Sequence, residues 1–318
     1  MMVRIETVAF LALLILTLLR LPSAIREPSS RLTWIATITG LAAIFMVGVA
    51  VPLPVVDGWL GASNVANLVQ NLLAVVAFWF VMEAARTLDG TRFNPRSLWE
   101  LSAMLLLFTI PFFLMADRGA TSDDFIKETA DQVGLWAYAS IYMACVVFIM
   151  TRMLIGIRGR KPRPYLLIRV GAWAILIASL IEIAYLTLRV ARQGRTPAVE
   201  LIGSLFTIPF YGGVVLVCAG IAVFAIARAG RASMHVALGG LLTRANVDRG
   251  MTLTTIPDED PVHETYRLAV RLTDIANSHE LTRRERILLR AAAELLDRQT
   301  RAPAVVRMSS APEKTVAA

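Results

Sequence analysis

Polar side chains that could bind a solute lie inside long apolar stretches of this sequence, where such groups are costly and usually face protein or a water-filled cavity. Asn67 and Asn71 share one helical face with Asn64, with Gln70 adjacent, and Glu182 lies in a later apolar stretch. We therefore predict an outward-facing polar cavity that binds a small solute and involves seven residues: Asn67, Gln70, Asn71, Glu182, Tyr185, Thr207 and Tyr211. The alternative is that these groups only form hydrogen bonds between packed helices, as Asn and Gln commonly do in membrane bundles.

The pentapeptide FTIPF occurs twice, at 108–112 and at 206–210. A proline inside a helix removes one hydrogen bond and frees a carbonyl group, which in lipid needs another partner such as a Ser or Thr hydroxyl. Thr109 and Thr207 each precede the motif's proline by two residues. We therefore predict helix kinks at Pro111 and Pro209, at similar depth. An internal inverted repeat is the alternative, but the flanking sequences do not align.

The usual signatures of enzymes and metal sites are missing from the sequence. It has no Gly-rich phosphate loop, no GxSxG motif and no cluster of acids within the apolar stretches. The three histidines, His235, His263 and His279, are not spaced like a helical metal pair, and we expect each at a surface or an interface. Cys145 and Cys218 lie in apolar stretches and are predicted to be small packing groups. We therefore expect neither enzymatic activity nor a cofactor or metal.

The composition indicates a membrane protein whose helices position these groups. Of the 318 residues, 56% are hydrophobic and 18% charged, whereas charged residues make up about a quarter of a typical soluble domain. Crossing the hydrocarbon core takes about 20 apolar residues, and seven stretches qualify: 5–21, 33–51, 64–85, 98–116, 134–156, 167–188 and 200–227. We predict an all-α polytopic bundle of seven transmembrane helices over residues 1–228. For the first stretch a signal peptide is the alternative.

The basic residues predict which side each loop faces, because Lys and Arg gather in cytoplasmic loops. Basic clusters follow the first, third, fifth and seventh stretches. The N-terminus is therefore predicted outside and the C-terminus inside. One loop disagrees, since it would place Arg189, Arg192 and Arg195 outside. At the cytoplasmic boundary, Glu83 and Glu100 lie beside Arg86 and Arg96, and we expect these acids and arginines to form interfacial ion pairs.

A small helical domain over 229–301 is predicted to follow the bundle in the cytoplasm. Its first helix begins at Asp260–Pro261, where an N-cap precedes a proline, and carries an apolar stripe formed by Tyr266, Val270, Ile275, Leu268 and Leu272. The second begins at a capping box, Thr282 and Glu285, and runs to Gln299 with one face formed by Leu288, Ala292 and Leu295. These helices would form a hairpin, and residues 302–318 are predicted to be disordered.

The second of these helices also resembles the opening helix of a LuxR-type helix-turn-helix domain. A DNA-binding domain of that kind needs a following recognition helix, and residues 297–307 offer none. We therefore exclude nucleic acid as a partner and expect the hairpin, 261–299, to contact the membrane bundle or a cytoplasmic protein.

The order of features resembles an actinobacterial membrane family classed as transporters, with seven spans and a C-terminal cytoplasmic domain of unknown function. The resemblance lies in Asp57–Gly58 with 64–68, in the block 136–226, and in YRLAVRLTD at 266–274. It implies a multi-pass protein of a bacterial cytoplasmic (inner) membrane. Arg outnumbers Lys 29 to 3, in keeping with such a source.

Two functions from different classes follow from these patterns. The leading hypothesis is a transporter or permease that binds a small solute in the outward-facing cavity. The alternative is a receptor or sensor that binds its ligand in the same cavity, bends at Pro111 and Pro209, and signals through the cytoplasmic helices to a partner. A membrane scaffold or immunity component without cargo is a third possibility.

Overall fold

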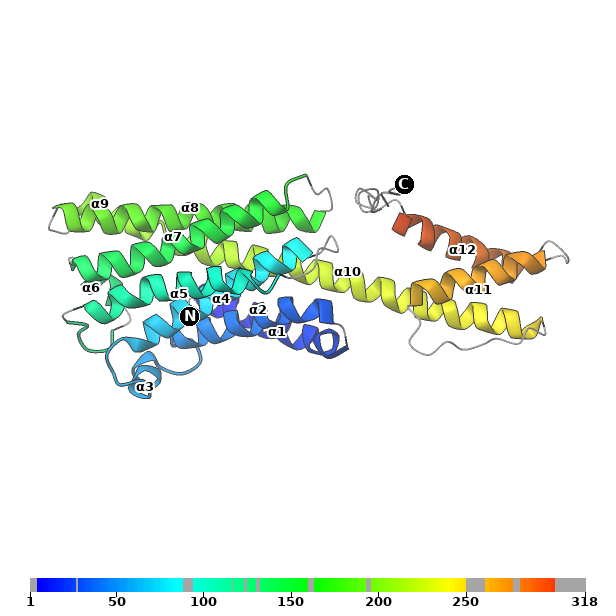
Figure 1. Cartoon of the computed structure of the whole chain (residues 1–318), viewed down its shortest axis with the longest axis horizontal. Helices are drawn as coiled ribbons and strands as arrows, with labels where there is room; N and C mark the ends of the chain where they lie inside the picture. Colours follow the sequence, from blue (N-terminus) through cyan, green and yellow to red (C-terminus); the bar gives the residue numbers. More distant parts are fainter. Residues whose placement is uncertain are drawn as a thin grey trace, which may run out of the picture. The chain divides into compact units, whose positions relative to one another are not determined.

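The computed structural model describes residues 5–26, 28–87, 94–115, 117–122, 125–129, 132–159, 163–192, 196–249, 261–276 and 281–300, and these ranges are all-helical without strands (Figure 1). Contacts divide the chain into two units, Met1–Ala225 and Ile226–Ala318. The sequence-based boundary at 228 lies close to this division. The predicted tail 302–318 lies outside the described residues.

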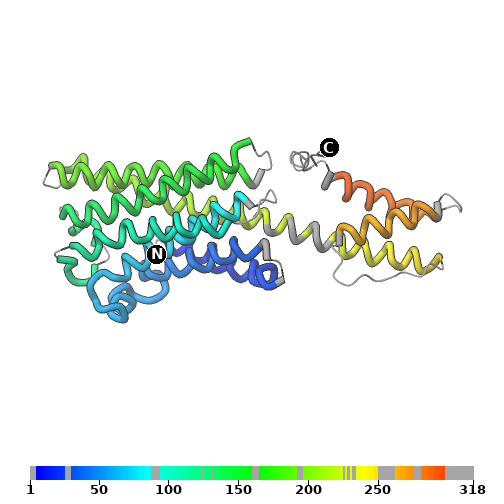
Figure 2. The backbone as a smooth tube through the Cα atoms, viewed as in Figure 1, coloured from blue at the N-terminus to red at the C-terminus, as the bar shows by residue number. Residues whose placement is uncertain are grey.

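The first unit is a bundle of long helices whose course can be followed in Figure 2. Its long helices are α1 (Ile5–Arg26), α2 (Pro28–Met46), α4 (Val65–Thr87), α5 (Ser97–Leu114), α7 (Val133–Gly156), α8 (Arg163–Arg192) and the first part of α10 (Thr207–Asp248). Three short helices are also found among the described residues of this unit: α3 (Leu53–Gly58), α6 (Phe125–Glu128) and α9 (Pro197–Ser204).

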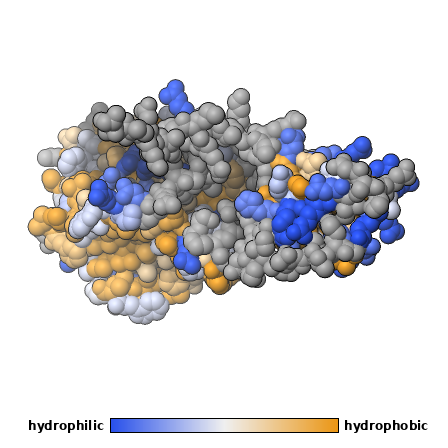
Figure 3. All heavy atoms as spheres, turned by 45° about the vertical axis from the view of Figure 1, so that its right-hand side comes forward, coloured by the Kyte–Doolittle hydropathy of each residue, from blue (hydrophilic) through white to orange (hydrophobic). Residues whose placement is uncertain are grey.

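Six helices among the described residues are long and apolar enough to cross a membrane. They are Ile5–Ile25, Val65–Arg86, Ser97–Leu114, Val133–Gly156, Tyr165–Ala191 and Pro197–Phe224, the last interrupted between α9 and α10. Large apolar side chains such as Leu106, Phe113 and Trp173 are exposed on these helices, and hydrophobic residues gather on the visible face of the first unit in Figure 3. Exposing so many large apolar side chains to water is unfavourable, and an apolar surface of this kind is typical of contact with a membrane. The chain is therefore a multi-pass integral membrane protein.

The second predicted span, 33–51, coincides with a shorter apolar helix, Ser30–Met46. The prediction that it continues to residue 51 is wrong, since α2 ends at Met46. Gly48 then adopts a φ of 90°, and a Cβ atom there would lie 2.9 Å from the backbone nitrogen of Leu53. Only glycine tolerates this left-handed turn against the start of α3 without strain.

The two FTIPF motifs occupy different places in the fold. Pro111 lies in the last turn of α5, and Thr109 donates its hydroxyl to the carbonyl of Leu105 at 2.6 Å. Pro209 lies in the first turn of α10, where the missing amide would have no intrahelical partner in any case. The second proline therefore begins a helix, and the predicted kink at Pro209 is replaced by a break between α9 and α10 at residues 205–206.

Aromatic and aliphatic side chains from several helices fill the core of the first unit. Phe108 and Phe112 of α5 are fully buried and pack against Tyr138 of α7, with ring centroids 6.1 and 5.2 Å apart. Gly171 of α8 lies against Gly213 of α10, because a Cβ atom on Gly171 would lie 2.6 Å from the carbonyl oxygen of Gly213. Small residues commonly allow membrane helices to approach this closely.

The described residues of the second unit form three helices, the last part of α10 together with α11 (Pro261–Ala276) and α12 (Arg283–Thr300). Its core consists of Leu238, Leu242, Leu268, Ala269, Leu272, Ala292 and Leu295. The predicted hairpin therefore lacked a third helix, which α10 supplies. The apolar stripe predicted on α11 is partly wrong, since Leu268 and Leu272 are buried whereas Tyr266 and Val270 are exposed. The side chain of Ile275, the fifth residue of that stripe, lies outside the described residues.

His235 of α10 is buried in this second unit, contrary to the surface or interface position expected for it. Its Nδ1 atom lies 3.3 Å from the hydroxyl of Thr265 on α11. The capping box is confirmed, because the amide of Thr282 donates to Glu285 at 2.7 Å and the amide of Glu285 donates to the Thr282 hydroxyl at 3.3 Å. The residues after Thr300 lie outside the described part of the chain, so the expected lack of a recognition helix there stays a prediction.

Candidate functional site

A cavity of about 80 Å³ lies inside the first unit between α1, α2, α4, α7 and α10. A water molecule needs roughly 10–15 Å³ of such volume, so the cavity has room for several waters or a small organic molecule. Most of its wall is apolar, and four of its lining residues have side chains with a nitrogen or oxygen atom: Thr37, Gln70, Tyr142 and Tyr211. The arrangement fits a small, largely apolar molecule that carries one or two hydrogen-bonding groups.

The cavity exists because small residues face each other on α2 and α4. Ala36, Gly40 and Ala43 follow one another at helical spacing on α2, and Ala74 and Ala77 do the same on α4. A Cβ atom on Gly40 would contact Leu13 at 3.5 Å and Ala77 at 3.6 Å, which is ordinary van der Waals distance. These small residues are the sequence signal from which the cavity could have been found.

The structure divides the seven predicted ligand residues among four places. Gln70 and Tyr211 line the cavity. Asn67 and Asn71 instead meet Tyr138 of α7: Asn71 donates its Nδ2 to the Tyr138 hydroxyl at 2.7 Å, and that hydroxyl donates to Oδ1 of Asn67 at 2.9 Å. This is the interhelical hydrogen bonding that was the alternative interpretation. Tyr138 is fully buried. It was missed because the sequence does not show which neighbouring helix a tyrosine in an apolar stretch will face.

Glu182 and Tyr185 lie on α8, away from the residues that line the cavity. Glu182 is 7% exposed and Tyr185 is 2% exposed. Thr207, the seventh residue, begins α10 and is partly buried. The predicted joining of Glu182 to the asparagines around one polar cavity does not appear among the described contacts.

Arg189 is the centre of a second polar group that sequence analysis assigned to a loop. Arg189 lies in α8, and its side chain is fully buried. Its Nη1 donates to Glu200 at 2.6 Å and to the Tyr185 hydroxyl at 3.1 Å. Its Nη2 donates to the carbonyl of Lys127 at 3.0 Å. The guanidinium therefore ties α6 and α9 to α8. The side chains of Arg192 and Arg195, counted with it as loop charges, lie outside the described residues.

Asp57 of α3 holds the N-terminus of α4. It is fully buried and accepts hydrogen bonds from the amides of Asn64 at 2.8 Å and Ala66 at 2.7 Å, and from the hydroxyl of Thr121. Asn64 in turn donates Nδ2 to the carbonyl of Arg118 at 2.6 Å. A carboxylate at a helix N-terminus is favoured by the free amides and the helix dipole. Asp57 and Asn64, which belong to the motif quoted for the family resemblance, thus join the segment 57–64 to the segment 118–122.

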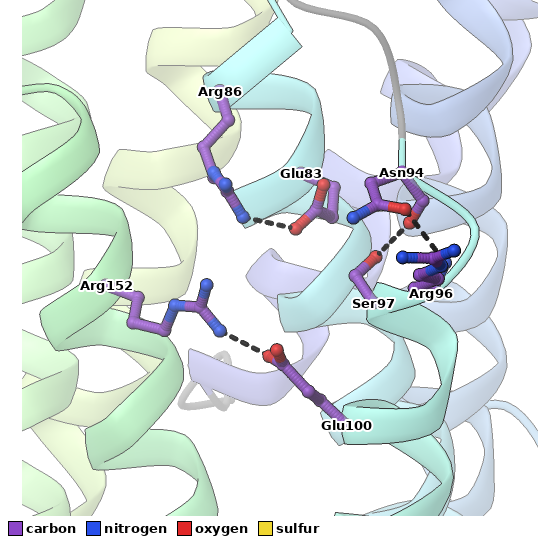
Figure 4. A network of polar contacts seen from close by, with 7 residues as sticks. All are labelled: Glu83, Arg86, Asn94, Arg96, Ser97, Glu100 and Arg152. Atoms are coloured by element: carbon purple, nitrogen blue, oxygen red, sulfur yellow. Dashed lines mark hydrogen bonds and ion pairs between the residues drawn. The ribbon is translucent and has the colours of Figure 1, made fainter.

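The opposite ends of α4, α5 and α7 carry ion pairs, shown in Figure 4. Glu83 pairs with Arg86 at 2.9 Å, as predicted. Glu100 pairs with Arg152 of α7, so the expected partner Arg96 was wrong; the backbone amide of Arg96 donates to Asn94. Since Arg152 is 52 residues from Glu100 in the sequence, its pairing required the fold.

In the second unit, Glu285 carries both the capping box and a bidentate ion pair. Arg249 donates Nε to Oε1 at 2.8 Å and Nη2 to Oε2 at 2.7 Å. The hydrogen bonds from Arg249, aided by those from Thr282, lower the pKa of Glu285 to about 2. This carboxylate therefore joins the end of α10 to the start of α12.

Comparison with known proteins gives no further assignment. No protein-family model, curated protein or solved structure matches the chain. The function must therefore be argued from the cavity and the helices around it.

Proposed function

We propose that this chain is a seven-span membrane receptor, with its N-terminus outside and its C-terminus in the cytoplasm, that binds a small and largely apolar ligand in the cavity. Support for a seventh span comes from α2, whose 19 residues would extend over roughly 28 Å, close to the thickness of the hydrocarbon core. The resemblance noted above favours a bacterial cytoplasmic membrane.

The burial of Arg189 supports this orientation. The positive-inside rule concerns charges in loops. Arg189 lies inside α8 with its charge balanced by Glu200, so it no longer counts against an external position for the α8–α9 connection. The end with Arg86 and Arg152 would then face the cytoplasm.

The single observation that carries the receptor function is the double role of α10. Its first part supplies Tyr211 and Val214 to the cavity wall, and its last part supplies Leu238 and Leu242 to the core of the second unit. A ligand that contacts Tyr211 therefore acts on a helix that the cytoplasmic unit also uses. A receptor of this kind would exchange between two conformations of α10. The ligand shifts that equilibrium only as far as its affinity for the two conformations differs.

The experiment fills the cavity from its wall. Ala74→Leu places a larger side chain in the cavity, and Ala103→Leu is the matched control because Ala103 is exposed on α5. Xenon, used as an apolar probe, should bind the reconstituted wild-type and A103L proteins and not A74L. Amide hydrogen exchange over 261–276 and 283–300 should change in A74L alone. If A74L lost xenon binding without any change in hydrogen exchange, the receptor function would be rejected. The assignment of the cavity as a binding site would still stand.

A permease is the second candidate, favoured by the break between α9 and α10. Discontinuous helices form substrate sites in many transporters, and here Leu205 and Phe206 separate two helices within one apolar span. Uptake of small apolar amides and alcohols into proteoliposomes tests this candidate. Saturable uptake that A74L abolishes and A103L retains would support it, whereas uptake equal to that of protein-free vesicles would reject it.

The exposed residues Tyr266 and Val270 of α11 support a contact with a cytoplasmic protein, the remaining part of this proposal. They lie one turn apart and outside the core of the three-helix unit, so replacing them with Ser should remove an interaction without unfolding α11.

A further inference from the structure

The segment 51–62, which contains α3, has an exposed surface without any charged side chain, and the indole N–H of Trp59 is its only side-chain hydrogen-bonding group. Its exposed residues are Pro52, Pro54, Val55, Gly58, Trp59, Leu60, Gly61 and Ala62. Trp59 is 68% exposed, Val55 46% and Leu60 39%. A loop that faces water at the end of a bundle normally exposes polar groups, so this surface needs another surrounding.

The single charged residue of the segment, Asp57, faces the interior of the protein. Asp57 is fully buried, and its carboxylate is occupied by the amides of Asn64 and Ala66 and by the hydroxyl of Thr121. Its neighbour Val56 is 1% exposed. The short helix α3 is therefore polar toward the protein at Asp57 and apolar toward its surroundings at Val55 and Trp59. This polarity is the reverse of that of a helix on a soluble protein.

The place of α3 in the bundle supplies the surrounding. It follows the end of α2 and precedes α4, a membrane-length helix, and Figure 1 shows it at the periphery of one end of the first unit. Its exposed apolar residues therefore lie close in the sequence to a membrane-length helix that also exposes apolar side chains. Tryptophan is enriched where the hydrocarbon core meets the headgroups, because its ring is apolar and its N–H is polar.

We propose that α3 is an interfacial helix that lies in the lipid headgroup region, with Val55, Trp59 and Leu60 inserted toward the acyl chains. The partner is the bilayer itself. Asp57 and Asn64 fix the depth of α3, because they tie it to the N-terminus of α4 and to the 118–122 segment.

Nitroxide spin labels on the full chain test this placement in phosphatidylcholine–phosphatidylglycerol vesicles. The background is C145A/C218A, and single cysteines replace Trp59 or, in a second variant that keeps the tryptophan, Val55. Position 128 is the aqueous reference, since Glu128 is an exposed residue of α6, and position 106 is the lipid reference, since Leu106 is exposed on α5. Accessibility to molecular oxygen and to a water-soluble nickel complex is measured at each position.

The expected result at 55 and 59 is several-fold higher oxygen accessibility and several-fold lower nickel accessibility than at 128, with values on the interfacial side of those at 106. Nickel accessibility equal to that at 128 would place α3 in water and overturn the proposal. Low accessibility to both reagents would show that protein, such as a second copy of this chain, covers the segment, and this result would also overturn it.

Discussion

Arg189 and Glu200 form an ion pair in which the two charges differ sharply in burial. The guanidinium is fully buried, whereas 43% of the carboxylate side chain is exposed, and the two are 2.6 Å apart. Because only one partner is fully buried, removing Glu200 and removing Arg189 should affect the stability of the protein differently. An isolated buried cation is far more costly than an isolated carboxylate that water reaches.

Glu200→Ala is therefore expected to destabilise the first unit more than Arg189→Met. The first change removes the acid that lies 2.6 Å from the buried guanidinium, whereas the second removes the buried cation itself, and the first should cost roughly 2–3 kcal/mol. Thermal unfolding of the two variants in detergent gives the order. Glu128→Ala removes an exposed acid of α6 and is the control. The opposite order, with R189M the less stable protein, would contradict the assigned burial.

Gly212 and Gly213 provide a matched pair for the contact between α8 and α10. A Cβ atom on Gly213 would lie 2.7 Å from the carbonyl oxygen of Gly171, whereas one on Gly212 would meet nothing within 4 Å. Gly213→Ala should cost about 1–3 kcal/mol because the two helices must move apart, and Gly212→Ala should be neutral or slightly stabilising. Unfolding midpoints of the two variants measure the difference. Equal midpoints would mean that α10 does not cross α8 at this glycine.

Sequence patterns located most of the spans, because a membrane-length apolar run leaves few other structures open to the chain. The capping box at Thr282 and Glu285 was equally readable, since its partners are three residues apart. Partners distant in the sequence were not, as Arg249 and Arg152 show. The break after Ser204 was missed because Leu205 and Phe206 are both apolar and continue the run. Arg189 was misread as a loop charge because its burial depends on Glu200 and on the carbonyl of Lys127, which only the fold brings together.

The hydrogen bond between Asn71 and Tyr138 should stabilise the bundle without contributing to ligand binding. Tyr138→Phe, Asn71→Leu and the double variant form a thermodynamic cycle. We expect a coupling free energy of about 0.5–1.5 kcal/mol, the range found for hydrogen bonds between membrane helices. Unfolding measurements give the coupling, and xenon binding to the same variants should stay unchanged because neither residue lines the cavity. Gln70→Leu, which alters the wall, is the comparison. A zero coupling would remove the assigned interhelical role.

Acid should weaken the second unit through Glu285. Because Arg249 and Thr282 lower its pKa from 4.5 to about 2 in the folded protein, the carboxylate's contribution is fully present above pH 4.5 and is lost progressively as pH falls toward 2. Hydrogen exchange of the amides in 283–300, corrected for the intrinsic effect of pH, should therefore show falling protection between pH 5 and 3 in the wild type, as the pKa difference requires. Glu285→Gln should have lower protection at neutral pH and a much flatter pH profile. Glu294→Gln changes an exposed acid of the same helix and should keep the wild-type profile. An unchanged acid response in E285Q would assign the sensitivity to another group and contradict the role of the Arg249–Glu285 pair.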